Sequence, residues 1–175
     1  MSLIDKTYFI GDISIPPSDF GNILTYIAKY EKQCIIDMVG YALYKEIAAY
    51  TVSGSTQRIK DIVEGKEYTF DDMTVKWGGL VNDEKESPLA YYIYYFYMKG
   101  NKTITGNVNE MSPQSENSES ASIVDKLIYS WDKFMELAFH YVYPFNSLFA
   151  FLQQNVSTYP EWEIVYRGRV NQFDL

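Results

Sequence analysis

The amino-acid sequence predicts a mainly α-helical single domain, a helical bundle with a small β-hairpin and extended terminal arms. Wound into a helix, residues 89–98 are apolar on every side, and residues 123–142 repeat apolar side chains at every third or fourth position. Between residues 66 and 77 the apolar period changes to two, which is typical of strands. A helix that is apolar all round must be buried on both sides, so residues 89–98 are predicted to form the centre of the bundle or a helix shared with another subunit. The chain of 175 residues fits one domain, 1–175.

The first segment, residues 1–17, is predicted to be an extended N-terminal arm. Its apolar side chains do not follow helical spacing, and it ends in Pro16-Pro17, which disfavours helix in the residues before it. An arm this apolar needs a surface to lie on.

Residues 18–100 are predicted to hold helices and the hairpin. Ser18 is a good N-cap for a long first helix, and Gly40 is predicted to act as a left-handed cap or a kink, after which helical spacing resumes. Ser55 can cap a further short helix that Gly65 ends. Two helices joined by such a short break form a helical hairpin.

The predicted β-hairpin spans residues 66–77. Apolar and polar residues alternate on both sides of Asp71-Asp72, a weaker turn sequence than Asn-Gly. The pair Ser87-Pro88 then gives a strong start to the aromatic helix, an N-cap serine followed by proline at the first helical position.

The second half of the chain is predicted to contain a flexible loop, two helices and a tail. Residues 101–120 are polar and are predicted to be flexible, because long loops in compact domains are usually functional or disordered. Residues 121–155 are predicted to be helical, with an end or a kink at Pro144. Residues 156–175 form a predicted extended tail, whose strand partner is the hairpin, the N-terminal arm or a neighbouring chain.

Composition argues against several classes of protein. A single cysteine, Cys34, and a single histidine, His140, disfavour a disulfide framework and most zinc sites. The net charge of −8 opposes specific nucleic-acid binding. The apolar helix is too short for a bilayer, which needs about 20 residues, and no secretory signal is expected, so no membrane partner is predicted and synthesis is expected in the cytoplasm.

The residue types that carry chemistry have ordinary structural interpretations. Cys34 lies in the apolar stripe of the first helix and is predicted to pack in the core. The spacing of Glu136 and His140 favours a solvated pair, and the Ser-x-x-Lys match at Ser130 and Lys133 lacks the companion motifs of penicillin-interacting enzymes. No phosphate-binding glycine loop occurs. The sequence therefore predicts no catalytic residue, no cofactor-binding residue and no metal ligand.

Tyrosine is unusually frequent, at 17 of 175 residues, and suits interfaces as well as cores. Large aromatic side chains are predicted to lie in the core or in an interface: Trp77, Tyr91, Tyr94, Tyr95, Trp131 and Trp162. A second group in the flexible loop is predicted to contact a partner: Thr103, Thr105, Gly106 and Asn107.

Several segments, in their order along the chain, carry a family resemblance: Met38-Val39-Gly40-Tyr41-Ala42-Leu43-Tyr44-Lys45-Glu46-Ile47, Gly65-Lys66-Glu67-Tyr68 leading to Trp77-Gly78-Gly79-Leu80, helix 89–98, Thr105-Gly106-Asn107-Val108 and Tyr159-Pro160-Glu161-Trp162. This order resembles the head-tail connector (head-completion adaptor) proteins of tailed double-stranded DNA phages or prophages of Bacteroidales type. The resemblance covers roughly residues 18–162. The hairpin and the tail are not part of the simplest connector pattern, which leaves the subfamily and the position in the ring open.

The resemblance implies a structural subunit that forms a homo-oligomeric ring between portal and tail proteins, leaves a channel for DNA and ends up in the virion. It carries over no catalytic residue. An alternative from another class is a bacterial, tyrosine-rich binding module for a peptide or small ligand, also without enzymatic activity. An enzyme using Glu136 and His140, or the acidic residues near Asp71, is the least favoured hypothesis.

Overall fold

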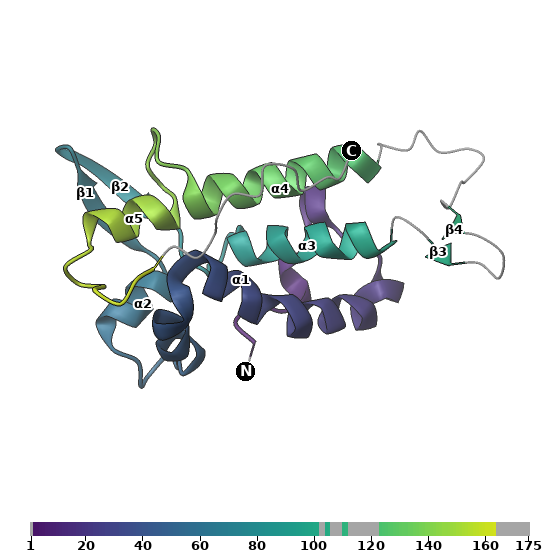
Figure 1. Ribbon diagram of the computed structural model, residues 1–175, viewed down its shortest axis with the longest axis horizontal. Helices are drawn as coiled ribbons and strands as arrows, with labels where there is room; N and C mark the ends of the chain where they lie inside the picture. Colours follow the sequence, from purple (N-terminus) through teal and green to yellow (C-terminus); the bar gives the residue numbers. More distant parts are fainter. Residues whose placement is uncertain (1, 102–103, 106–109, 112–122, 164–175) are drawn as a thin grey trace.

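The computed structural model describes residues 2–101, 104–105, 110–111 and 123–163. The fold is mainly α with a small antiparallel hairpin, as predicted. The helices α1 (Phe20–Ala48), α3 (Pro88–Asn101) and α4 (Ile123–Phe139) run along the long axis of the molecule, with α3 between the other two (Figure 1). Among the described residues, no helix combines the length and the apolar character needed to cross a bilayer.

The aromatic helix α3 is the centre of the bundle. Leu89 and Ile93 are fully buried, and Tyr94 and Tyr95 are each only 1% exposed, so side chains on opposite sides of the helix lie in the core. The helix starts where the sequence predicts it, because Ser87 Oγ accepts a hydrogen bond from the Leu89 N–H (3.2 Å) and donates one to the Leu80 carbonyl (2.7 Å). The prediction of burial on both sides is confirmed.

Helix α1 is broken at Gly40, which has φ 84° and ψ 164°. The two predicted alternatives, a cap or a kink, are thus resolved as a kink, because the chain returns to helical geometry directly afterwards. The Val39 carbonyl, freed by the break, accepts a hydrogen bond from the Glu163 N–H (3.3 Å).

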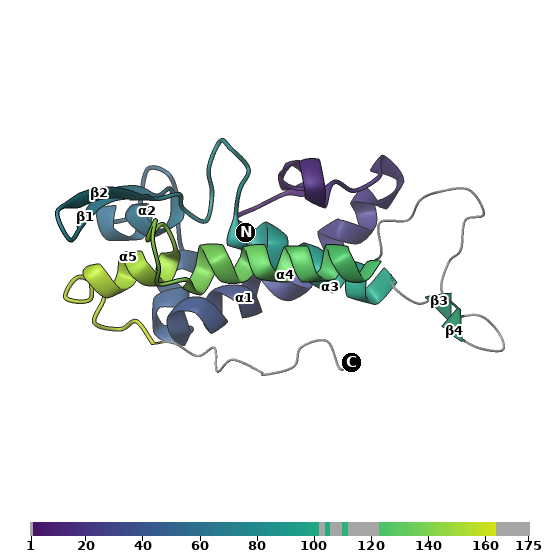
Figure 2. The same cartoon turned by 90° about the horizontal axis from the view of Figure 1, so that it is seen from above.

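The N-terminal arm lies on a surface of its own chain, as its apolar character predicts, and its backbone is extended only in part. Its backbone forms three short 3-10 turns, Lys6–Tyr8, Gly11–Ile13 and Pro17–Asp19, and runs along one side of the bundle (Figure 2). Five apolar side chains of this segment are buried in the core of the same chain: Ile4, Tyr8, Phe9, Ile13 and Ile15. The apolar arm therefore packs on its own chain, with Ile10 among its exposed residues.

The β-hairpin has the predicted limits. Strand β1 (Lys66–Phe70) pairs with β2 (Met73–Trp77), and the turn residues Asp71 and Asp72 have φ values of 44° and 64°. Two positive φ values give the turn type whose twist matches that of the strands, and aspartate tolerates this conformation. The short helix α2 (Gln57–Val63) precedes the hairpin.

The C-terminal elements differ from their predicted limits. Helix α4 ends at Phe139, five residues before Pro144, and α5 (Leu148–Gln154) begins after Ser147, whose Oγ accepts a hydrogen bond from the Ala150 N–H (3.1 Å). Turns, and no strand, occupy residues 156–163, which corrects the prediction for that part of the tail; residues 164–175 lie outside the described residues.

Most of the predicted loop 101–120 also lies outside the described residues. Two short strands within it, β3 (Ile104–Thr105) and β4 (Glu110–Met111), pair with each other in antiparallel fashion. They lie beyond the end of α3, at the opposite end of the molecule from β1 and β2 (Figure 1).

Candidate functional site

The aromatic residues predicted for the core or an interface fall mainly in the core. Trp77, Tyr94 and Tyr95 are each 1% exposed and Trp131 is also buried. The Trp77 Nε1–H donates to the Ile62 carbonyl (2.9 Å), and the rings of Tyr95 and Trp131 lie 4.9 Å apart between α3 and α4. These four side chains therefore hold the subunit together and are not available to a partner.

The other two predicted aromatic residues are half-buried. Tyr91 makes an edge contact with Tyr129 at 6.2 Å, and burial raises its pKa above the usual value. Trp162 donates from Nε1 to the Met38 carbonyl (3.3 Å) and contacts the ring of Phe149 at 5.5 Å. Both rings thus have their main contacts within the subunit.

The predicted partner-contact loop is described at one position only. Thr105 lies in β3 and pairs with Glu110, whereas Thr103, Gly106 and Asn107 lie outside the described residues. Their predicted role in partner contact stays a prediction.

The residues weighed for chemistry are engaged in structural contacts. Cys34 is fully buried, which raises the pKa of its thiol well above the usual value. Glu136 pairs with Lys133 (2.8 Å), so the Ser130-Lys133 match does not form a nucleophile and base; Ser130 Oγ donates to the Leu127 carbonyl (3.1 Å) instead. His140 lies just beyond the end of α4. Within the described residues, no three His, Cys, Asp or Glu side chains gather in a way that could hold a metal ion.

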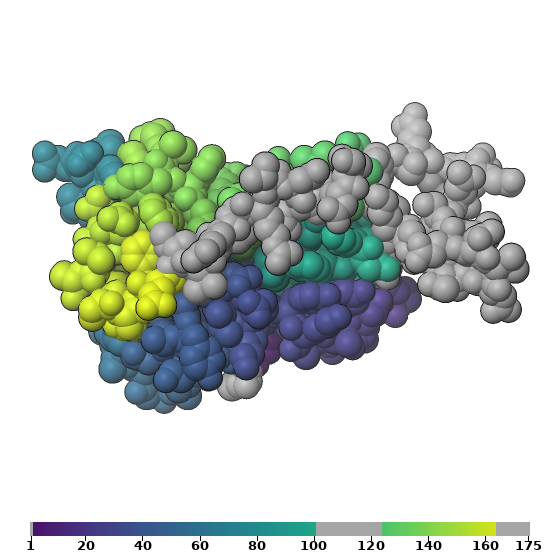
Figure 3. Space-filling model, viewed as in Figure 1, coloured from purple at the N-terminus to yellow at the C-terminus, as the bar shows by residue number. Residues whose placement is uncertain are grey.

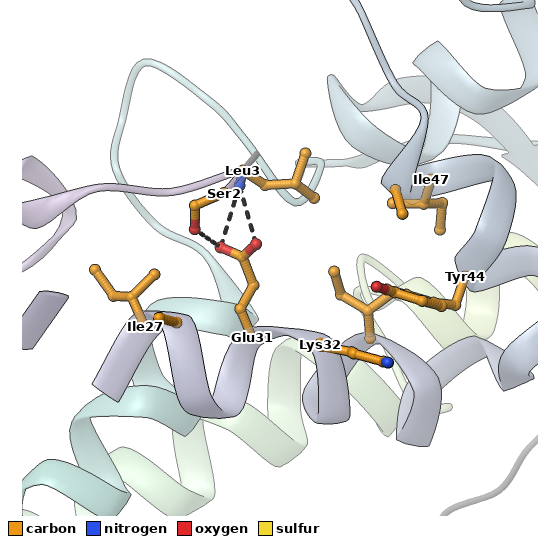
Figure 4. A pocket seen from close by; sticks show the side chains of 10 residues that line it. Ser2, Leu3, Ile27, Glu31, Lys32, Tyr44 and Ile47 are labelled. Carbon is orange, nitrogen blue, oxygen red and sulfur yellow. Dashed lines mark hydrogen bonds between the residues drawn. The ribbon is translucent and has the colours of Figure 1, made fainter. Parts of the chain in front are cut away.

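A small pocket lies inside the bend of α1 (Figure 4). It has a volume of about 290 Å³, and its wall combines apolar side chains from both halves of α1 with Leu3 of the N-terminal segment. The carboxylate of Glu31 points toward this segment and accepts hydrogen bonds from Ser2 Oγ (2.6 Å), the Leu3 N–H (3.0 Å) and the Ile4 N–H (3.2 Å). Glu31 therefore binds the chain's own N-terminal segment. The sequence carried a signal for it, since Ile27, Glu31 and Ile35 share one face of the helix.

Arg58 forms a second polar junction that sequence reasoning missed. Its guanidinium pairs with Glu46 near the end of α1 and with Glu161 after α5, and it donates to the Thr158 carbonyl (3.2 Å). The hydroxyl of Tyr159 donates to the Arg58 carbonyl (2.9 Å). This junction ties the segment after α5 to α2. Thr158 and Glu161 lie 100 and 103 residues from Arg58, and partners this distant give no local pattern in the sequence.

At the end of the molecule that carries the hairpin, aromatic contacts hold the residues between α4 and α5 against the two strands. The ring of Phe145 stacks on Phe70 at 3.9 Å, and the Tyr68 hydroxyl donates to the Phe145 carbonyl. Tyr141 contacts the rings of Phe70 (5.7 Å) and Phe149 (5.4 Å). The connector between α4 and α5 is thereby fixed against the hairpin.

Four apolar side chains of β2 and of this connector are exposed. Together they form what we call the hairpin-end surface: Met73 (40%), Tyr141 (43%), Val142 (54%) and Tyr143 (77%). The hairpin projects here from one end of the molecule, next to the residues that follow α4 (Figure 3). A groove of about 390 Å³ runs between β2 and the connector, with Met73, Val75 and Tyr143 in its lining. Clustered exposed apolar side chains are typical of protein interaction sites.

Comparisons with protein-family models, with curated proteins and with solved structures find no match to this chain. Every buried side-chain nitrogen or oxygen atom in the described part of the chain has a hydrogen-bond partner. The hairpin-end surface is the feature of the described residues that most resembles a site for another molecule.

Proposed function

We propose that this protein is a structural subunit of a phage-type head-tail junction, and that copies of it assemble into a ring between portal and tail proteins. The observation that carries the proposal is the hairpin-end surface, which places Tyr141, Val142 and Tyr143 in solvent on a connector held by aromatic stacking. Exposing such side chains in a lone subunit is unfavourable, and a partner that covers them removes this cost.

The shape of the subunit supports a ring. The hairpin β1–β2 projects at one end of the long helices and the β3–β4 ladder lies at the other (Figure 1). Two unlike ends suit heterologous, head-to-tail contacts, which close into a ring when the rotation between subunits permits. The net charge of −8 also suits a DNA conduit, because a surface of like charge repels phosphates within a Debye length of roughly 10 Å.

Native mass spectrometry and negative-stain electron microscopy of the purified chain, alone and with portal protein, test this proposal. We expect a closed ring, or a ring that forms on the portal. Val142→Ser should weaken assembly and leave the fold intact, whereas Val52→Ser removes a similarly exposed valine (72% against 54%) outside the hairpin-end surface and should assemble normally. A monomer that persists at high concentration with portal protein present would count against the proposal.

The pocket in the bend of α1 favours the second candidate, a non-enzymatic binding module for a small ligand or peptide. Its volume of about 290 Å³ suits one large apolar side chain, with Lys32 and Tyr44 in the wall. Filling it through Ala28→Leu should abolish ligand binding by such a module and leave ring assembly unchanged, so the same assembly assay separates the two functions.

A further inference from the structure

The strand β2 has an unpaired outer edge. In the hairpin register, Phe70 pairs with Met73, Tyr68 with Val75 and Lys66 with Trp77 across the two strands. In an antiparallel pair closed by a two-residue turn, these residues exchange the hydrogen bonds and the intervening ones point their N–H and C=O groups outward. On β2 the outward residues are Thr74 and Lys76, and both are exposed. Within the described residues, these outward backbone groups form no hydrogen bond.

A groove follows the same edge. It is lined by β2 on one side and by Tyr143, Pro144 and Asn146 on the other, and no residue of β1 contributes to it. Neighbouring strands lie about 4.8 Å apart, so a strand added to β2 would place every second side chain into this groove. Met73 and Tyr143, which are 40% and 77% exposed, would supply the apolar contacts.

The charge near this edge identifies the type of segment that fits. Asp71 and Asp72 at the tip are exposed and form no ion pair within the described residues. Lys76 of β2 lies opposite Glu67 of β1 in the register, so the two aspartates give this end of the hairpin its negative charge. The whole chain has 23 acidic and 15 basic residues, but residues 164–175 contain Arg167 and Arg169 against Asp174 alone. This stretch also begins with Ile-Val-Tyr, residue types that favour strands. It is thus complementary to the hairpin in charge and in β propensity.

We propose that the outer edge of β2 accepts residues 164–175 of a second copy of this chain as an added strand. The inference depends on the proposed function, and it names the head-to-tail contact of the ring. The segment starts beside Glu163, which is fixed to Val39 at the bend of α1. Twelve extended residues span at most about 40 Å, which sets the greatest distance between Glu163 and the edge that the segment can reach.

The test uses a synthetic peptide with the sequence of residues 164–175, labelled with fluorescein, and full-length protein at a concentration at which gel filtration gives a monomer, so that no second copy occupies the edge. We expect the fluorescence anisotropy to rise on titration. Thr74→Pro removes one outward N–H from the edge and should weaken binding about tenfold, the effect of one lost backbone hydrogen bond. The matched control is Thr69→Pro, which makes the same change on the outer edge of β1 and should bind as the unsubstituted protein does. Proline at an outward position leaves the hairpin's own hydrogen bonds intact, and the fluorescence of Trp77 checks this.

A second pair of variants tests the charge argument. Asp71→Asn and Asp72→Asn keep a residue type that tolerates the positive φ of the turn, and both should weaken peptide binding at low salt. Three outcomes would each overturn the inference. The first is absence of binding, and the second is an equal loss of binding in Thr74→Pro and Thr69→Pro. The third is peptide binding only after residues 164–175 are deleted, because the chain's own tail then occupies the edge.

The two proposals fail separately. A ring that forms at the same protein concentration with and without Thr74→Pro would overturn the added strand and leave the connector function standing. Peptide binding at the β2 edge without any ring, in the presence of portal protein, would support the added strand and count against the connector function.

Discussion

At the scale of single residues, Glu31 determines how the N-terminal segment is held. Its side chain is only 8% exposed and accepts hydrogen bonds from Ser2 Oγ and from the backbone N–H groups of Leu3 and Ile4. Backbone N–H groups that are buried need an acceptor, and a segment without regular secondary structure has few of its own. Glu31 supplies that acceptor, so it substitutes for the strand partner that an extended arm would otherwise require.

Glu31→Gln should destabilise the subunit by about 1–3 kcal/mol, because the amide nitrogen of glutamine would face donors and leave a buried N–H unpaired. Urea denaturation followed by tryptophan fluorescence measures this change. Glu67→Gln makes the same substitution on an exposed residue of β1 and should leave the free energy of unfolding nearly unchanged. Equal stability of both variants would show that the N-terminal segment is held by its apolar side chains alone.

The buried tyrosines predict loss of stability in alkaline solution. Burial and the nearby Tyr141 raise the pKa of Tyr68 to about 12 from 10.0, and burial also raises the pKa of Tyr8 and Tyr92. The unfolded state therefore loses its phenolic protons first, so this contribution to stability is complete below pH 10 and declines as the pH rises toward 12. Urea midpoints across this range should fall, and they should fall less for Tyr68→Phe. A midpoint that does not change with pH would contradict the burial of these hydroxyls.

At the scale of elements, the sequence pattern of α1 predicted where the helix breaks but not which residue binds at the break. The apolar spacing indicated helix on both sides of Gly40, and glycine indicated a special backbone conformation between them. The Val39 carbonyl at the break accepts its hydrogen bond from the Glu163 N–H, a partner far along the chain. Local pattern thus located the break, and it gave no sign of this tertiary contact.

Gly40→Ala should cost about 1–3 kcal/mol, because a side chain is strained at φ 84° and ψ 164°. An added Cβ would also lie 3.1 Å from Glu163 Cβ. The matched control is Gly21→Ala in the first turn of the same helix, where an added Cβ meets no atom within 4 Å and should be neutral or slightly stabilising. Thermal unfolding of both variants by circular dichroism measures the difference; similar melting temperatures would argue against the break.

Local sequence pattern also predicted the limits of the hairpin, and it did not predict the end of α4. Strict alternation and a turn that tolerates positive φ predicted both strands with their observed limits. Helix α4 was predicted to run toward Pro144, because Val142 continues its apolar stripe, yet it ends at Phe139. The residues after it leave the helix to place Phe145 on Phe70, a gain that no local pattern reveals. The exposed surface of this connector was missed for the same reason.

At the scale of the whole molecule, α3 joins the two other long helices into one cooperative unit. Tyr92 contacts Phe134 of α4 at 5.0 Å, while Phe96 stacks on Tyr30 of α1 at 4.4 Å. The sequence predicted this central position from the absence of a polar side on the helix. It left open whether one side meets a neighbouring subunit, and the burial of Tyr94 and Tyr95 assigns both sides to the core of the monomer.

Ile93→Asp and Tyr94→Asp should therefore both unfold the isolated subunit, because each places a charge in the core without a partner. Circular dichroism and gel filtration at low concentration measure this outcome. Ile128→Asp on the exposed side of α4, where Ile128 is 40% exposed, is the control and should remain folded. A folded Tyr94→Asp subunit that fails only in assembly would place that side of α3 in an interface.

The hydrogen bonds that Trp162 and Glu163 make at the break in α1 have a consequence for biosynthesis. The Trp162 Nε1–H and the Glu163 N–H bind carbonyls of Met38 and Val39, so the first helix is bound by residues that are synthesised 124 positions later. Contacts this distant in sequence slow folding, and a nascent chain that lacks them exposes apolar surface. The first helix therefore completes these contacts only after residue 163 has been translated.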